Sequence, residues 1–148
     1  MKRMPVVYLH QHSVRDEEID QLGHVNNVQY IRWMQVAAIA HSDAQGWTTA
    51  DYQKLGAGWV VRSHFIEYLQ PAFAGDQVTI RTWVAEMKRV TSLRKFEIYR
   101  INSEAEILLA KAETNWAFVE FTSGSLRRIP AEIAAAFELQ SEDSPKFS

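Results

Sequence analysis

The residues of this 148-residue chain best placed to do chemistry lie in a polar stretch just before a long apolar one. Asp20 stands three residues before Gly23, and both precede the start of an expected helix. The first turn of a helix offers unpaired N–H groups and a positive dipole end, which stabilise an oxyanion. With a carboxylate beside them, such donors can hydrolyse an activated acyl group, because the N–H groups polarise its carbonyl and the carboxylate attacks it or deprotonates water. By spacing alone, Asp20, Asn26 and Asn27 are more typical of helix caps.

Histidines near this stretch allow other chemistry. Three roles are open to His24: a general base paired with Asp20, a metal ligand, or a ring hydrogen-bonded inside the turn. The last is the commoner role of a lone histidine near a helix start. His10 and His12 fall on one face of an expected strand, a spacing that two zinc ligands can use. Because the chain has no cysteine and no defined third ligand, we expect no metal site and interpret the pair as exposed strand residues.

Cations that could contact a phosphorylated ligand flank one expected turn. Lys88, Arg89 and Arg94 are candidates for such contacts, although a solvated turn is the common role of such a cluster. The chain has no G-x-S-x-G nucleophile elbow, no G-x-G-x-x-G and no phosphate-loop motif. Their absence argues against a classical serine hydrolase, a nicotinamide enzyme and a nucleotide hydrolase.

Composition limits the classes of protein to which the chain can belong. With 16 Lys and Arg against 18 Asp and Glu, no Cys and 47% hydrophobic residues, the chain is typical of one globular domain, which we assign to residues 1–148, with a frayed polar tail from about residue 140. The scattered cations form no basic stripe, so we expect no nucleic-acid partner. No apolar run is long enough for a membrane span or a signal peptide, so we expect no membrane association and a cytoplasmic location.

One long helix and five strands must position these residues. The helix is expected over Asn27–Gln45, capped by Asn26 or Asn27 and stopped by Gly46, and it carries so few charges that most of its circumference should be buried. Short turns between the last four strands predict a meander, with Leu108 to Phe118 alternating on one face. The layout is α+β, with the sheet wrapped around the helix. The expected strands, and a short closing helix given last, are Val6–Val14, Gly58–Leu69, Gln77–Met87, Thr91–Ile101, Glu106–Phe121 and Pro130–Phe137.

The stretch VRDEEIDQLGHVNNVQYIRW, from Val14 to Trp33, resembles the signature of hotdog-fold acyl-CoA thioesterases of the 4-hydroxybenzoyl-CoA thioesterase superfamily. In that signature an Arg, an acidic residue and D-x-x-G-H-V-N-N-x-x-Y open the central helix. The matching residues are Arg15, Glu18, Asp20, Gly23, His24, Val25, Asn26, Asn27 and Tyr30. The stretches IEYLQPAFAGDQVTI and RRIP also resemble the family, which extends the likeness from Val6 to about Leu139. It implies the hotdog fold, a five-stranded antiparallel sheet curled around one long central helix.

The resemblance implies hydrolysis of an acyl-CoA to a free acid and coenzyme A. Asp20 would be the nucleophile or general base, and backbone N–H groups near Asn26 and Asn27 would form the oxyanion site. Gly23 and His24 complete the motif. A second lineage of the fold uses a Glu on the central helix, but none occurs between Asn27 and Gln45, so Asp20 must supply the carboxylate.

Substrate and assembly also follow from the resemblance. Tyr30 joins Arg89 and Arg94 as a candidate substrate contact. No metal and no bound cofactor are implied, because coenzyme A is part of the substrate, and an acyl carrier protein is an alternative carrier. Subunits of this family pair their sheets edge to edge with the acyl-CoA at the interface, so we expect a homodimer or a tetramer of dimers.

Two other functions suit the same fold. An enoyl or 3-hydroxyacyl thioester hydratase or dehydratase would use Asp20 and His24 as an acid–base dyad, but hydratases of this fold have an Asn-Pro and a His in a different spacing. A non-catalytic acyl-CoA-binding module would bind the thioester without releasing thiol, and the presence of Asp20 argues against it. The sequence leaves open the acyl group and whether Asp20 acts as nucleophile or base.

Overall fold

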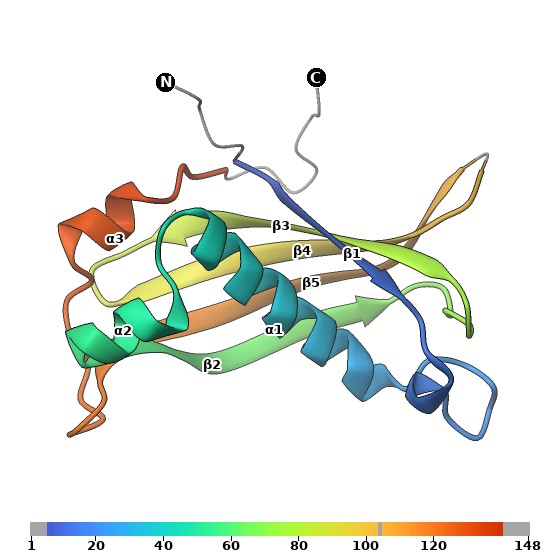
Figure 1. Ribbon diagram of the computed structural model, residues 1–148, viewed down its shortest axis with the longest axis horizontal. Helices are drawn as coiled ribbons and strands as arrows, with labels where there is room; N and C mark the ends of the chain where they lie inside the picture. The colour runs from blue at the N-terminus through green and yellow to red at the C-terminus, as the bar shows by residue number, and fades with distance from the viewer. Residues whose placement is uncertain (1–5, 104, 141–148) are drawn as a thin grey trace.

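The computed structural model describes residues 6–103 and 105–140. A five-stranded antiparallel sheet curls around one long helix, and two shorter helices lie near one end of it (Figure 1). The predicted α+β layout is therefore confirmed. In chain order the elements are β1 (Tyr8–Ser13), the 3-10 turn η1 (Asp16–Glu18), α1 (Asn27–Ala44), α2 (Thr49–Leu55), β2 (Ala57–Tyr68), β3 (Gln77–Met87), β4 (Thr91–Ile101), β5 (Glu106–Glu120) and α3 (Ala131–Ala135).

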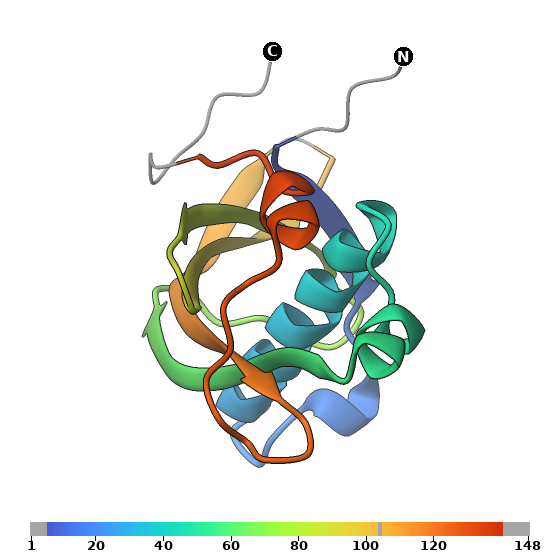
Figure 2. The ribbon, with the colours of Figure 1, turned by 90° about the vertical axis from the view of Figure 1, so that its left-hand side faces the viewer.

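Helix α1 buries one stripe of side chains rather than most of its circumference. Figure 2 shows the sheet curving around one side of the helix. The opposite side exposes the apolar residues Val28, Val36 and Ile39. The predicted burial of most of the helix circumference is therefore wrong for a single chain, because one sheet can cover only one side. The buried stripe follows the helical spacing of three and four and consists of Tyr30, Trp33, Met34, Ala37, Ala38 and His41.

The strand order is β1-β3-β4-β5-β2, so the predicted meander is right for β3, β4 and β5 and wrong for β2. Strand β2 pairs with β5, from Ala57 opposite Glu120 to Tyr68 opposite Ala110. The link between β2 and β3 has eight residues. A link of that length can extend about 26 Å, whereas three strand spacings span about 14 Å, so a short link does not require neighbouring strands here. Strand β2 is an edge of the sheet.

A bulge in β5 changes the faces of its first residues. Pairing with β4 passes from Ile98 opposite Ala110 to Tyr99 opposite Leu108, which leaves Leu109 as the extra residue. Leu109 and Ala110 are both fully buried. The predicted alternation from Leu108 is therefore wrong at that residue, because the bulge turns it away from the core that holds Leu109 and Ala110.

The sequence pattern predicted the ends of some elements correctly and missed one helix. The bounds predicted for β3 and β4 are confirmed. Helix α2 was not predicted, although Thr48 and Asp51 form a capping box at its start. The tail predicted to be frayed lies outside the described residues from position 141 onward. Among the described residues, no helix is both long and apolar enough to cross a bilayer.

Candidate active site

Asp20 lies in a tight loop between η1 and α1. Its Oδ1 accepts hydrogen bonds from the backbone N–H groups of Leu22, at 2.8 Å, and His24, at 3.3 Å. Gly23 adopts a φ of +83°, the left-handed conformation that closes the loop. The Asp20 side chain is partly exposed, and its Oδ2 accepts no hydrogen bond from the described residues. The loop therefore holds one carboxylate oxygen and leaves the other available.

The start of α1 lies just beyond this loop. Asn26 is the N-cap, and its Oδ1 accepts from the N–H of Val28 at 3.0 Å. The N–H of Asn26 donates to the carbonyl of Glu18 at 2.9 Å, so it is not available as the predicted oxyanion donor. The N–H of Asn27 forms no hydrogen bond within the described chain. Of the two asparagines, only Asn27 offers a free backbone donor at the helix start, and only Asn26 acts as a side-chain cap.

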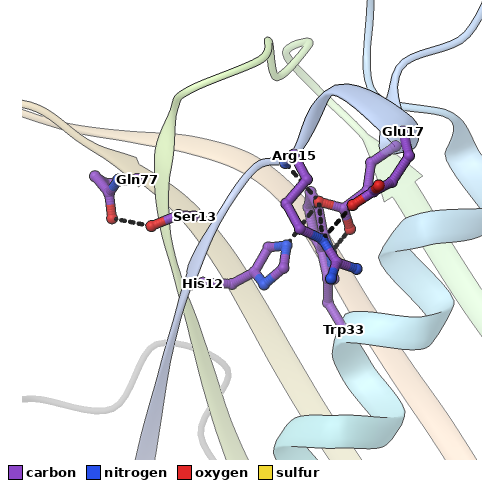
Figure 3. Close-up of polar contacts among 7 residues, drawn as sticks. His12, Ser13, Arg15, Glu17, Trp33 and Gln77 are labelled. Carbon is purple, nitrogen blue, oxygen red and sulfur yellow. Dashed lines mark hydrogen bonds and ion pairs between the residues drawn. The ribbon is translucent and has the colours of Figure 1, made fainter.

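A buried carboxylate, Glu18, supports the loop. It is 3% exposed, and its Oε1 accepts from the N–H of Arg15 at 2.9 Å and contacts Nε2 of His12 at 2.8 Å. Its Oε2 accepts from Nε1 of Trp33 at 2.8 Å, and Figure 3 shows the side chains of His12, Arg15 and Trp33 around this point. Burial acts to raise the pKa of Glu18, but the hydrogen bonds from Arg15, His12 and Trp33 lower it below its ordinary value. Through these contacts Glu18 links β1, the loop before α1 and α1 itself.

His12 was interpreted, together with His10, as an exposed residue of the first strand. Tyr8, His10 and His12 are the partly buried residues of β1, so the predicted shared face of the two histidines is confirmed. The interpretation of His12 as an exposed residue is wrong, because this face of β1 lies against α1, and its ring packs 5.2 Å from that of Trp33. Among the described residues, no three His, Asp or Glu side chains group as metal ligands.

Two other motif residues pack against aromatic rings. The ring of His24 packs edge-on against Phe73 at 5.5 Å and forms no hydrogen bond to the described residues, so it makes no dyad with Asp20. Tyr30 is 2% exposed and packs against Trp33 and Tyr68. Burial raises the pKa of Tyr30 to about 12. Tyr30 therefore packs in the core of the single chain, and its contact with substrate stays a prediction.

The cations expected at one turn have different surroundings. Arg89 is exposed in the turn between β3 and β4. Arg94 is only 6% exposed, and its Nη1 lies 3.0 Å from Oγ1 of Thr82 and 2.9 Å from Nδ1 of His41. A solvated cluster is therefore the wrong interpretation for Arg94, because its position on β4 points to the side of the sheet that α1 covers.

A cavity of about 460 Å³ lies toward the other end of α1 and is lined by Arg94. Ala38 and Ile39 line it from α1. The rise of an α-helix places these two residues about 17–18 Å along α1 from Asn27, so the cavity and the Asp20 loop lie toward opposite ends of the helix. Sequence reasoning did not anticipate this cavity, whose aromatic walls come from α2, β2, β5, the segments before α2 and after β5, and the segment after α3: Trp47, Tyr52, Trp59, Trp116, Phe121 and Phe137.

Comparison with known proteins identifies related chains. The model of the thioesterase-like superfamily matches residues 14–137. YneP of Bacillus subtilis, a protein provisionally named an acyl-CoA thioesterase, is 29% identical over 95 residues, which cover 64% of this chain and 69% of YneP. ATL2 of Arabidopsis thaliana, a chloroplastic acyl-acyl carrier protein thioesterase, is 24% identical over 84% of this chain and 65% of its own. Slr0204 of Synechocystis, a 1,4-dihydroxy-2-naphthoyl-CoA thioesterase, shares the fold, with a TM-score of 0.79 at 17% identity over 88% of this chain and 94% of its own.

Proposed function

We propose, from the premise that this chain belongs to the thioesterase-like superfamily and has the hotdog fold, that it hydrolyses an acyl-CoA to a free acid and coenzyme A. Family membership makes the chain a thioester hydrolase, and the name of YneP supports coenzyme A as the carrier. The observation that carries the residue assignment is the Asp20 loop. It pairs a held carboxylate with an unpaired N–H, that of Asn27, at the start of α1.

Asp20 supplies the carboxylate in this proposal. Two backbone N–H groups fix its Oδ1, which leaves Oδ2 to act. In the nucleophilic route, Oδ2 attacks the thioester carbon, the C–S bond breaks, and coenzyme A leaves as a thiolate that takes a proton from water. A water molecule then hydrolyses the acyl-aspartyl anhydride, which releases the acid and restores the carboxylate. In the general-base route, Oδ2 takes a proton from a water that attacks the same carbon, the C–S bond breaks, and the departing thiolate receives that proton. Both routes require the carboxylate in its charged form.

Asn27 supplies the oxyanion donor. Its N–H belongs to the first turn of α1, where the helix dipole adds positive potential. The carbonyl of Asn26, which lies in the same peptide group as this N–H, accepts a hydrogen bond from the N–H of Gln29 at 2.9 Å. The hydroxyl of Tyr68 donates to the carbonyl of Asn27 at 3.0 Å, which holds this residue near β2. A donor held in this way can stabilise the negative oxygen of a tetrahedral intermediate without reorganising.

Two copies of the chain complete the site in this proposal. Strand β2 is an edge strand and exposes Val60 and Phe65, and antiparallel pairing of two β2 strands is a two-fold, self-complementary contact. Such pairing brings the start of β2 in one copy toward the end of β2 in the other. Because Trp59 lines the cavity and Tyr68 contacts Asn27, each cavity then faces the partner's catalytic loop.

Release of thiol from short, long and aromatic acyl-CoAs tests the proposal. The variant Asp20→Asn should lose about 10²- to 10⁴-fold in kcat with little change in KM, because it removes a base or nucleophile and keeps the shape of the loop. Asp16→Asn, at an exposed position in η1, is the matched control and should keep the parent rate. A folded Asp20→Asn protein with the parent rate contradicts the role of Asp20. A parent protein that releases thiol only from acyl carrier protein thioesters contradicts coenzyme A as the carrier.

A further inference from the structure

Arg94 is a buried cation that no carboxylate among the described residues neutralises. Its side chain is 6% exposed, and its only hydrogen bonds to described residues use Nη1, to His41 and Thr82. Its guanidinium also lies 5.9 Å from the ring centre of Phe137. Burial lowers the pKa of Arg94 to about 10, which still leaves the group charged at neutral pH.

The groups that contact Arg94 are neutral. A guanidinium only donates hydrogen bonds, so Nδ1 of His41 accepts from it and the ring carries no charge. Burial, and then the nearby Arg94, lower the pKa of His41 to about 3. The hydroxyl of Thr82 accepts from Arg94 and donates to the carbonyl of Lys95 at 3.0 Å. A buried charge without a counter-charge is costly to fold, so the surroundings of Arg94 suit an anion that the chain itself does not supply.

The cavity next to Arg94 defines the shape of that anion's carrier. Its aromatic walls suit an apolar body, and Nε1 of Trp116 is a buried donor with no hydrogen-bond partner in the described chain. Asp43 is the single carboxylate among the lining residues, and it is exposed and forms no ion pair with Arg94. The Nε and Nη2 donors of Arg94 form no hydrogen bond to the described residues, and two such donors match the two oxygens of a carboxylate. An apolar chain or ring with a carboxylate at its end fits these features together.

We propose that the cavity binds an acyl group that carries a carboxylate at the end remote from the thioester, and that Arg94 forms the ion pair with it. The substrate class is then an ω-carboxyacyl thioester. This inference rests on the proposed function for its thioester but not for its ion pair. A free carboxylic acid has the same chemistry, and the experiment separates the two sources.

The first measurement tests the ion pair without catalysis. Trp47, Trp59 and Trp116 line the cavity, so their fluorescence reports a ligand that enters it. Octanoate and the neutral 1-octanol differ in charge at one end. We expect the parent protein to bind octanoate about 10- to 100-fold more tightly than 1-octanol, the range for a charge-assisted hydrogen-bonded contact, and Arg94→Gln to remove that difference. The matched control Arg128→Gln changes an exposed cation that does not line the cavity, and it should keep the preference for octanoate.

The second measurement identifies the source of the carboxylate. Suberoyl-CoA and octanoyl-CoA have the same chain length and differ in the terminal carboxylate. We expect Arg94→Gln to lower kcat/KM about 10- to 100-fold for suberoyl-CoA and to leave octanoyl-CoA nearly unchanged. Equal binding of octanoate and 1-octanol by the parent protein overturns the inference. So does an Arg94-dependent preference for octanoate without a preference for suberoyl-CoA, because the cavity then binds only a free acid.

The ion pair can still be tested if Arg94→Gln does not fold or if the parent protein has no thioesterase activity. If Arg94→Gln does not fold, the comparison of octanoate with 1-octanol in the parent protein, together with Arg94→Lys, which keeps the charge, still decides the ion pair. If the parent protein hydrolyses neither these two thioesters nor any other acyl-CoA of the panel, the proposed function fails. Fluorescence titration with the two intact thioesters then decides whether the cavity prefers the ω-carboxyacyl group.

Discussion

Replacing Glu18 by glutamine should destabilise the protein more than its small change in shape suggests. The carboxylate is buried and receives hydrogen bonds from Arg15 and Trp33 and a contact from His12. Glutamine keeps one acceptor oxygen but turns the other position into a donor, so at least one buried donor loses its partner. An unpaired buried donor costs about 1–3 kcal/mol, and the remaining bonds lose their charge assistance, so we expect a loss of about 2–4 kcal/mol at pH 7.

The pH dependence provides a second, independent signature. The pKa of Glu18 is lower in the folded protein than its ordinary value of 4.5, so its charged form stabilises the fold above pH 4.5. That contribution is lost as the pH falls through the lower folded value. The difference in free energy of unfolding between the parent and Glu18→Gln should therefore be largest at neutral pH and shrink below pH 4.5.

Urea denaturation at one protein concentration, from pH 7 down to pH 3, measures both effects. Glu17→Gln is the matched control, because Glu17 is 71% exposed and its one ion pair within the described chain is a surface pair with Arg15. It should change the free energy of unfolding by less than about 0.5 kcal/mol. Equal destabilisation by the two variants, or a Glu18→Gln difference that does not change with pH, would refute the stabilising role of the hydrogen bonds around Glu18.

Two more variants separate the roles of the loop residues. Asn27→Pro should fold, because proline suits the first turn of a helix and Asn26 already has the extended conformation that precedes proline. It should lose about 10²- to 10³-fold in thiol release by deleting the oxyanion N–H, whereas Asn26→Ala, which removes the cap, should reduce stability by about 1 kcal/mol and keep the rate. His24→Ala should keep most of the thioesterase rate, measured in the same assay, because its ring packs on Phe73; a loss as large as that of Asp20→Asn would instead support an acid–base dyad.

Local sequence patterns were enough to predict most elements but not their order in space. Strands β3 and β4 were bounded correctly because alternation and turn residues are local signals. The position of β2 beside β5 was missed because a link of eight residues is long enough for either arrangement. The bulge at Leu109 was missed because only pairing with β4 reveals an extra residue in a strand.

The candidate site was predicted only in outline, because its motif is local in the sequence but its contacts depend on the fold. The family-like motif placed Asp20 and Gly23 in one loop before α1, which the structure confirms. The hydrogen bond from the N–H of Asn26 to the backbone carbonyl of Glu18 was not predicted. It forms because the loop folds back on itself, and the spacing of residues in the sequence does not reveal that. The burial of Arg94 depends on which face of β4 the helix covers, and the charged pair Arg94 and Lys95 gives no pattern to decide it.

The separation of the Asp20 loop from the cavity leads to one more prediction. At the rise of an α-helix, α1 is about 27 Å long, so an acyl group in the cavity of one chain is better placed for the carboxylate of a paired copy. Two defective variants, Asp20→Asn and Arg94→Gln, should then complement each other. In a hybrid dimer, one site combines the intact Asp20 of the second variant with the intact Arg94 of the first. Random pairing makes half of the dimers hybrid with one intact site of two, so co-expressed variants should recover about one quarter of the parent rate on suberoyl-CoA. If both residues act within one chain, every site lacks one of them, and the mixture will be no more active than the average of the two variants alone.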